Sequence, residues 1–561
     1  MPVCSVVRHP HQSRTWRSQL WMTWCVAALL WHSSALSTEE CPLYVNEAGA
    51  NVQNCSGKDL SEVLASQLSD RAEVLDFSRN RFTTIPVVSE SKECPQEHKC
   101  GSHNSTYHCR QDISFSRNQI YNFSGDSLAS LVCLRTLDLS FNELTAEVFH
   151  SNTFQLGVFY LQRLLLNNNP LGSLPGSVIT QPFLPHLWEL NLSHCDLEEL
   201  DPNSVDDFGE LEILDLSFNK LKAIDGKTFK GLSKLKRLDL RENQLTELSE
   251  SIFGDLVSLE VLLLSDNNIQ VFHDNAFYGD SKLKTLDLRG NQLTSVPYTT
   301  LVKLTQLQTL DLSQNPIQQV TRGPTCRSLG ALTLDDMPDL SELGPYSLAS
   351  FPGLESLSVS GNKALETIHP KFLGDNLNKH KLKHIRLENN KLSTLSGDSL
   401  PWKQLEELKV GGNSWYCDSQ LEWMIRAESI QSDITCSGPI TLKGENIKNV
   451  NPADLSRDYA LKSATAVIIM SLCLPIFGVC VLLIWRRRRY CPCVKVTLKG
   501  QYVTLFTREM DEDGDQRMAV ALKVNGSKLS AISNGSADDT RPFIKLQGPE
   551  RLVHVPDEED V

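Results

Sequence analysis

The sequence predicts an α/β repeat fold, a solenoid in the form of a horseshoe with a parallel sheet on its concave side, and two observations predict it. A central apolar residue, followed by an apolar residue two positions later and usually by Asn five positions later, occurs fourteen times between Leu75 and Asn413. From Leu190 to Leu310 the step between these patterns is a constant 24 residues. A fixed period of this length is typical of arrays in which each unit buries its apolar face against its neighbours.

The central residues are Leu75, Ile113, Leu137, Leu164, Leu190, Leu214, Leu238, Leu262, Leu286, Leu310, Leu332, Leu357, Ile385 and Leu408. Five positions later stand Asn80, Asn118, Asn142, Asn169, Cys195, Asn219, Asn243, Asn267, Asn291, Asn315, Met337, Asn362, Asn390 and Asn413. We refer to this second column as the ladder.

One unit, residues 211–221, shows why these residue types recur. Leu214 and Leu216 alternate with Asp215, so a short strand directs its leucines inward and the residue between them to solvent. The turn after the strand buries backbone groups that neither helix nor sheet satisfies. The amide of Asn219 has both donors and an acceptor for these groups. The ladder residues are therefore expected to be structural and not catalytic, and Phe229, Phe253 and Phe277 should stack as a further column on the convex side.

The ends of the array carry cap motifs. Cys41-Pro42 and Cys55 precede the first repeat, and Trp415, Cys417 and Cys436 follow the last. With these motifs the chain resembles extracellular leucine-rich repeat proteins, such as Toll ectodomains and neuronal adhesion proteins. The resemblance implies disulfide-closed caps, with Cys41 bonded to Cys55 and Cys417 to Cys436. Where the family usually has a further Cys, this chain has Ser419, so a second C-terminal bridge is not expected.

The two ends of the chain predict a membrane topology. Arg14 and Arg17, an apolar run at 20–31 and a small-residue site ending at Ser37 are typical of a secretory signal peptide, with a short anchoring helix as the alternative. Residues 464–485 carry no charge, and at about 1.5 Å per residue they span about 33 Å, enough for a bilayer core. Four arginines at 486–489 follow, which predicts that the repeats are extracellular and that the protein lies in the plasma membrane as a type I protein.

Four further cysteines lie around the longest step, the 38 residues from Leu75 to Ile113. They are Cys94, Cys100, Cys109 and Cys133. In an oxidising compartment we expect disulfides whose connectivity the sequence does not set, and the alternative is a zinc site that includes His103 and His108. Cys195 and Cys326 lie too many repeats apart to bond each other and are expected to be buried thiols.

Candidate surface sites fall into two groups. N-glycosylation acceptor triplets begin at Asn54, Asn104, Asn122 and Asn191, and each is used or unused depending on its context. Outward strand residues proposed for ligand contact on the concave face are Asp138, Leu165, Asp215, Asp239, Leu263, Asp287 and Asp311. The aspartates suggest an acidic ribbon, although Asp is also a frequent structural filler at this position.

The net charge of the repeats bears on the class of partner. Removing about +3 for the signal peptide and about +1 for the tail from the chain's −14 leaves about −18 for the rest. That balance favours basic partners and disfavours nucleic acid.

The tail carries short candidate motifs. Cys491 and Cys493 are palmitoylation candidates beneath the membrane. Tyr502 and Leu505 form a pattern similar to a tyrosine-based endocytic signal, and the end from Glu559 to Val561 resembles a PDZ ligand, so an endocytic adaptor and a PDZ protein are candidate partners. Residues 494–498 and 502–505 have strand-like composition within a tail expected to be largely disordered.

The predicted organisation is a signal peptide at 1–37, an N-terminal cap at 38–70, about 14 repeats at 71–413 with a Cys-rich insertion at 91–110, a C-terminal cap at 414–460, a transmembrane helix at 464–485 and a cytoplasmic tail at 486–561. No catalytic, cofactor or metal motif is present. The first functional hypothesis is a cell-surface receptor or adhesion protein that binds protein ligands. The alternatives are a co-receptor that controls the endocytosis of another receptor, and a proteoglycan-like matrix interactor.

Overall fold

The computed structural model describes residues 41–455, apart from 64–67, 89–108, 150–153, 155–157, 175–183, 203, 206–207, 278–280, 378–379 and 431–432, and the backbone of six strands between 494 and 546. The chain divides into two compact units, residues 1–458 and 459–561. Each unit is described by itself.

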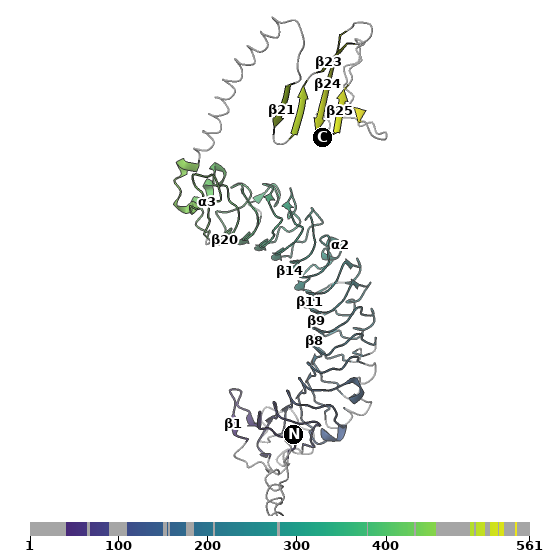
Figure 1. The fold of residues 1–561 in the computed structure, drawn as a ribbon. Coiled ribbons are helices and arrows are strands. Elements are labelled where there is room, and N and C mark those ends of the chain that lie inside the picture. The colour runs from purple at the N-terminus through teal and green to yellow at the C-terminus, as the bar shows by residue number, and fades with distance from the viewer. Residues whose placement is uncertain are drawn as a thin grey trace, which may run out of the picture. The chain divides into compact units, whose positions relative to one another are not determined.

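The first unit is built on one long sheet, whose labelled strands follow one another along the inner side of the coils (Figure 1). Strand β1 pairs antiparallel with β2, and every later strand pairs parallel with the strand before it in the sheet. The strands are β1 (Leu43–Val45), β2 (Asn51–Asn54), β3 (Val74–Asp76), β4 (Asp112–Ser114), β5 (Thr136–Asp138), β6 (Arg163–Leu165), β7 (Glu189–Asn191), β8 (Ile213–Asp215), β9 (Arg237–Asp239), β11 (Val261–Leu263), β13 (Thr285–Asp287), β14 (Thr309–Asp311), β15 (Ala331–Thr333), β17 (Ser356–Ser358), β19 (His384–Arg386) and β20 (Glu407–Lys409).

The register of this sheet confirms the predicted repeat. Central residues face central residues along the whole array, as Leu214 faces Leu238 and Leu310 faces Leu332. Leu75 faces Ile113 in the same way, so the 38-residue step leaves the pairing of β3 with β4 intact. The central leucines are buried in one continuous core, which is the packing that the period requires.

The ladder asparagines hold successive turns together. The Asn243 amide Nδ2 donates to the carbonyls of Leu216 (3.0 Å) and Leu240 (3.1 Å), and its Oδ1 accepts from the Leu221 N–H (3.1 Å). Each of these carbonyls thus receives donors from two repeats, since Asn219 also donates to Leu216. This explains why the ladder tolerates residues other than Asn.

Two substituted ladder positions illustrate that tolerance. At Cys195 the thiol donates to the Leu166 carbonyl (3.3 Å), which also accepts from Asn169. At Met337 there is no donor, but the Leu334 carbonyl accepts from Asn362 (3.0 Å). One amide per shared carbonyl is enough to avoid an unpaired buried oxygen.

The side of the coils away from the long sheet carries short elements and the predicted aromatic column. Phe229, Phe253 and Phe277 are buried and stack with centroid distances of 6.4 and 5.0 Å, which confirms the expected column. Short strands also pair outside the long sheet, β10 (Glu247–Leu248) with β12 (Val271–Phe272) and, in later repeats, β16 (Glu342–Leu343) with β18 (Thr367–Ile368). The described helices of the array are η2 (Gly125–Ser127), η3 (Ala146–Val148) and α2 (Tyr298–Leu301).

Disulfides close both ends of the array. Cys41 bonds Cys55 beside the β1–β2 hairpin, and Cys417 bonds Cys436 in a cap that contains η5 (Ser419–Leu421), α3 (Glu422–Arg426) and η6 (Ile447–Asn449). The indole of Trp415 is fully buried and donates to the Val410 carbonyl (2.9 Å), which fastens the last repeat to this cap.

At the described end of the insertion after β3, Cys109 forms a disulfide and is not available for the alternative zinc site. Cys109 and Cys133 are both disulfide-bonded. A cysteine in a disulfide has no thiolate to offer a metal, so Cys109 is removed from the zinc alternative. Cys94, Cys100, His103, His108 and the acceptor Asn104 lie outside the described residues.

The second unit contains more strand than the largely disordered tail that the sequence predicted. The two segments of strand-like composition form the antiparallel pair β21 (Val494–Leu498) and β22 (Gln501–Leu505). A further antiparallel sheet contains β23 (Thr507–Met510), β24 (Gln516–Val524), β25 (Ser527–Ala531) and β26 (Lys545–Leu546). Alternation within 516–524 and 527–531 is the signal that the sequence analysis did not use.

The predicted signal peptide at 1–37 and the predicted transmembrane helix at 464–485 lie outside the described residues. None of the helices that the structure does describe has the length and the apolar composition needed to cross a membrane.

Candidate functional site

The long sheet has an open face, formed by the first and third residue of each strand. The central residue of each strand is buried, while most of these flanking residues are half-buried, as in β8 and β13. This pattern follows from the alternation of side chains along a strand. The open face is therefore a long, regular surface that the repeats can offer to a partner.

Carboxylates recur on the open face because they close the turn after the strand. Oδ1 of Asp215 accepts from the backbone N–H (3.0 Å) and the hydroxyl (2.6 Å) of Ser217. Oδ1 of Asp311 likewise accepts from the Ser313 N–H (2.9 Å). A short polar side chain that accepts from the N–H two residues later is a standard turn element. The structural explanation for the acidic ribbon is thus supported at these positions.

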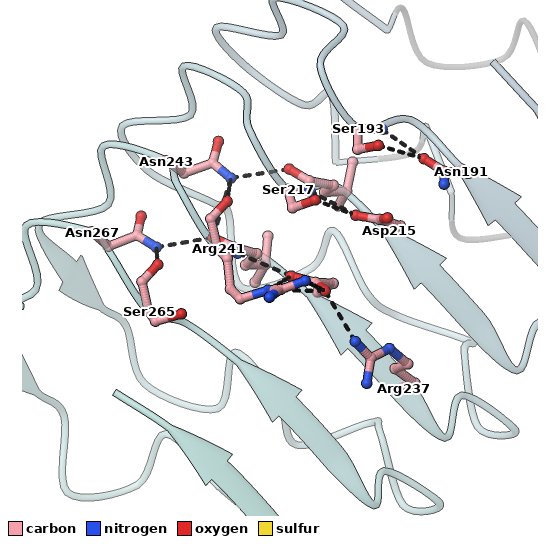
Figure 2. A network of polar contacts seen from close by, with 12 residues as sticks. Asn191, Ser193, Asp215, Ser217, Arg237, Arg241, Asn243, Ser265 and Asn267 are labelled. Carbon is pink, nitrogen blue, oxygen red and sulfur yellow. Dashed lines mark hydrogen bonds and ion pairs between the residues drawn. The ribbon is translucent and has the colours of Figure 1, made fainter. Parts of the chain in front are cut away.

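Asp239 differs from the exposed carboxylate that the sequence suggested. Its side chain is only 2% exposed, and the guanidinium of Arg241 covers it with contacts of 2.9 Å to Oδ1 and 2.8 Å to Oδ2. Arg237 adds a further contact to Oδ2 at 3.2 Å. Figure 2 shows the side chains of Arg237 and Arg241 directed toward one another. Residues 237, 239 and 241 share one face because strand side chains alternate. The expectation of an exposed carboxylate at Asp239 is therefore wrong, because Arg237 and Arg241, two residues before and after it, neutralise its charge.

The other predicted carboxylates are not neutralised in this way. The ion pairs of the described residues include Asp239 but not Asp138, Asp215, Asp287 or Asp311. Burial raises the pKa of Asp287, and the charge of Asp311 raises it further, although hydrogen bonds from Arg289 and Ser265 act against the rise. The charge of Arg241 also acts against the rise. Because no ion pair of the described residues includes Asp287 or Asp311, this part of the face can accept a cation.

The structure adds a carboxylate that the sequence analysis missed. Asp335 accepts from the hydroxyl of Ser358 (2.8 Å) and the N–H of Ser360 (2.6 Å). Burial raises the pKa of Asp335, and Asp311 contributes to the rise. Asp335 was missed because it lies three positions after its central residue, whereas only the residue directly after each central residue was considered. Together, Asp287, Asp311 and Asp335 form what we name the acidic segment.

The remaining strand candidates are less distinctive. Leu165 and Leu263 are half-buried, as residues that flank a central leucine should be. At the C-terminal end of the sheet, the basic strand residues Arg386 and Lys409 both lie near Glu407, at 3.6 and 3.0 Å. Their charge is therefore partly balanced within the sheet.

Other predicted sites have mixed outcomes. Cys195 is a buried free thiol, as expected, and its pKa is raised to about 12 by burial. Cys326 is also free but only half-buried, so the expectation of a buried thiol is wrong there. The reason is that Cys326 lies in a loop and not at a ladder position. Asn54, Asn122 and Asn191 lie on the described surface. No cluster of metal-binding side chains occurs within the described ranges.

Among the candidate residues of the tail, the structure describes Tyr502 and Leu505. Tyr502 and Leu505 lie on β22, where Tyr502 pairs with Thr497 of β21. Cys491, Cys493, Glu559 and Val561 lie outside the described residues.

Aromatic side chains at the margins of the open face were also missed. Phe218 is 42% exposed and stacks on His194 at 4.2 Å, and the guanidinium of Arg163 lies over the Trp188 ring. The sequence could have revealed Phe218, because the repeat period places it in the turn directly before the ladder residue. That turn position is left-handed (φ 56°), and a large aromatic residue there is unusual.

Comparison with known proteins agrees with this architecture. The family described as leucine rich repeat matches residues 159–221, 209–269 and 258–317, and a second leucine rich repeat family matches residues 130–147. These matches cover less than half of the chain.

Among curated relatives, chondroadherin of Mus musculus is 38% identical over 73 residues, which is 12% of this chain and 20% of that protein. Toll-like receptor 3 of Boselaphus tragocamelus is 29% identical over 129 residues, 23% of this chain and 14% of that protein. The chain thus spans a fifth or less of the length of these relatives.

A solved structure shares the fold. The Drosophila Toll–Spatzle complex contains a chain with a TM-score of 0.52 and 19% identity, and the match covers 70% of this chain and 56% of that chain. With the parallel sheet, the Asn ladder and the disulfide caps, these matches identify the chain as a protein that contains leucine-rich repeats, similar in part to extracellular proteins of that type.

Proposed function

We propose that this chain is a single-pass type I protein of the plasma membrane that binds an extracellular or membrane protein ligand through the open face of its repeats and has no enzymatic signalling domain of its own. The observation that carries the proposal is the open face itself, a long row of half-buried side chains that belongs to no internal interface of the described repeats. A rigid array that displays side chains at fixed spacing is suited to binding another macromolecule.

The charge of this face favours a basic ligand. The acidic segment holds three carboxylates on adjacent strands and their following turns, and the whole chain has a net charge of −14. A ligand with Lys or Arg side chains would relieve the repulsion among these carboxylates and would be steered toward them.

The two cap disulfides support an extracellular location of the repeats. Closed disulfide caps fit an oxidising compartment. The proposal also includes the signal peptide at 1–37, the membrane span at 464–485, glycans on the acceptor asparagines, and palmitoylation at Cys491 and Cys493. In the tail, Tyr502 with Leu505 and the end at Val561 are proposed contacts for an endocytic adaptor and a PDZ protein.

A relative offers a precedent for this type of binding. Toll forms a complex with Spatzle, as the description of that structure states. At 19% identity the similarity speaks for the fold alone, so ligand binding by this chain is our proposal and not a property inherited from Toll.

Proximity labelling on living cells tests the proposal. The full chain is compared with the double variant Asp287→Asn, Asp311→Asn, which keeps the turn acceptors and removes two charges. The matched control is Asp225→Asn, Asp255→Asn, which removes two exposed carboxylates outside the sheet; Asp225 also accepts an N–H two residues later, at 2.8 Å. We expect both variants to reach the surface, and only the first to lose the labelled partner. Equal labelling by all three chains would remove the acidic open face as the binding surface.

A further inference from the structure

Several aromatic side chains border the open face near strands β5 to β8. On the edge before these strands lie Phe159 (53% exposed), Tyr160, His186 and Trp188; on the edge after them lie Phe141 (37%), His194 and Phe218 (42%). We name these seven residues the aromatic patch. Within each edge some of the rings stack in pairs, as Tyr160 does on His186 (5.6 Å, 2°) and Phe218 does on His194 (4.2 Å, 9°), while the guanidinium of Arg117 lies over the ring of Phe141.

The same positions in later repeats are filled by pairs of opposite charge. Tyr160 and His186 stand four residues before their central leucines, and at that position in the next two repeats Glu210 pairs with Lys234 (2.5 Å). Trp188 stands two residues before Leu190, where the next two repeats pair Glu212 with Lys236 (2.8 Å). The fold therefore does not need aromatic side chains at this edge.

The opposite edge leads to the same conclusion. Phe141, His194 and Phe218 all have positive φ, at 55°, 53° and 56°. Gly290 fills the equivalent turn position in a later repeat. Glu242 and Gln314 occupy the same left-handed position in other repeats, so the turn does not require an aromatic residue there.

Asn191 lies between the two aromatic edges, at the end of β7. Its Oδ1 accepts from the N–H (2.9 Å) and the hydroxyl (2.8 Å) of Ser193, as Oδ1 of Asp215 does from Ser217 in the next repeat. An aspartate would thus close the turn equally well. Asparagine adds only the amide nitrogen Nδ2, which takes part in neither bond and points away from Ser193 in Figure 2.

The charges around Asn191 are balanced on one side. Arg163 pairs with Glu189 (2.5 Å) and lies over the Trp188 ring. The charges of Arg163 and Glu189 neutralise each other, and aromatic residues lie on both sides of this part of the face. It therefore suits a neutral, amphipathic ligand better than an ion. A pyranose ring has that chemistry, since its C–H face packs on aromatic rings while its hydroxyls stay in water.

We propose that Asn191 carries an N-linked glycan whose first sugars lie on the aromatic patch, so that the patch is covered by the chain's own glycan and protein ligands are directed to the strands from β9 onward. This inference rests on the proposed function, because it requires the secretory route. The acceptor is the triplet Asn191-Leu192-Ser193.

The chemistry of attachment is a group transfer from a lipid-diphosphate-linked oligosaccharide. Nδ2 forms a bond to C1 of the first sugar, and the bond between C1 and the diphosphate oxygen breaks. The lipid diphosphate leaves with the electron pair, and one proton leaves Nδ2 for the base of the transferase. Because the folded turn uses only Oδ1 of Asn191, the modified side chain keeps the same two hydrogen bonds.

Glycopeptide mapping of the full chain from a secreting cell tests occupancy. Enzymatic deglycosylation in heavy-oxygen water converts each occupied asparagine to a labelled aspartate. Asn54 is a matched control, since its Oδ1 accepts from the N–H (2.9 Å) and hydroxyl (2.6 Å) of Ser56 in the same geometry. We expect label at Asn191. Label at Asn54 or Asn122 without label at Asn191 would overturn the inference and leave the proposed function standing, as would a chain that surface biotinylation finds on the cell but that carries no label at any site. A chain that carries no label and never reaches the cell surface would remove both proposals.

Hydroxyl-radical footprinting tests where the glycan lies. The variant Asn191→Asp removes the acceptor but keeps the turn as Asp215 forms it, and Ser193→Ala removes the acceptor while keeping Asn191. In both variants we expect oxidation of Tyr160, Trp188 and Phe218 to rise severalfold, with Tyr121, 56% exposed outside the patch, unchanged. Unchanged oxidation of the patch would show that the glycan points into solvent, and protection that persists on cells without the glycan would indicate a protein partner; either result would overturn the proposal.

Discussion

At the residue scale, the ladder shows how one amide satisfies backbone groups of adjacent repeats. Asn267 donates to the carbonyls of Leu240 (2.9 Å) and Leu264 (3.1 Å) and accepts from the N–H of Leu245 (3.1 Å). The two carbonyls have second donors in Asn243 and Asn291. The side-chain oxygen of Asn267 is therefore the part of the amide that has no substitute.

Replacing Asn267 by Ala should leave the buried N–H of Leu245 without its partner. An unsatisfied buried donor costs about 1–3 kcal/mol, so we expect a decrease of that size in the free energy of unfolding. The adjacent Asn268 has an exposed side chain and provides the control Asn268→Ala. Denaturant unfolding of both variants measures the difference, and equal stability of the two would contradict the structural role of the ladder.

Cys195 should be chemically inert in the folded chain. Its side chain is fully buried, and burial raises its pKa to about 12, so almost no thiolate forms at pH 8. We expect iodoacetamide to modify Cys326 first and Cys195 only after unfolding, as measured by peptide mass spectrometry. Faster modification of Cys195 would show that the ladder opens readily at this repeat.

The acidic segment should make stability depend on pH. Burial of Asp287 raises its folded pKa above the ordinary value of 3.8, so the folded state binds protons more tightly than the unfolded state. The contribution of Asp287 to the free energy of unfolding is thus most favourable below pH 3.8, and it is lost as the pH rises through the folded pKa. Asp287→Asn should accordingly raise the melting temperature relative to the parent chain at pH 7 but not at pH 3. The exposed Asp225→Asn is the control, and a gain for Asp287→Asn that is equal at both pH values would refute this reasoning.

At the element scale, each repeat depends on its neighbours on both sides of the core. Phe253 is 3% exposed and lies between Phe229 and Phe277. Its ring is therefore shared by three repeats.

Phe253→Ala should destabilise these three repeats together. Truncating a buried Phe to Ala typically costs about 3–5 kcal/mol, because the cavity is only partly filled by relaxation. We expect faster amide hydrogen exchange in β9, β11 and β13, with β17 to β20 little changed. The exposed Phe218→Ala should cost about 1 kcal/mol or less, the value of its stacking on His194. Uniform acceleration along the whole array would mean that it unfolds as one unit.

The sequence predicted the repeats well because their signal is local and periodic. Every predicted central residue is paired in register, and the Phe column and both cap disulfides are present. The surface was predicted less well. Whether Asp239 is exposed depends on the rotamers of Arg237 and Arg241, and the burial of Asp335 depends on Ser358 of the next strand, so neither follows from the period alone.

At the scale of the whole molecule, stability and binding are separated within the repeats. The leucines, the ladder and the Phe column lie in the core, while the open face carries half-buried residues that the fold uses through few atoms. Substitutions on the open face can therefore change a ligand without disrupting the array, which is the property expected of a binding scaffold.

The most direct measurement of the central claim is site-specific photo-crosslinking on living cells. A photoreactive amino acid replaces Thr309, an exposed open-face residue of β14, or Lys227, an exposed residue outside the sheet. We predict a covalent adduct with another protein from position 309 and none from position 227. Adducts only from position 227, or none from position 309 in a chain that reaches the cell surface, would contradict ligand binding by the open face.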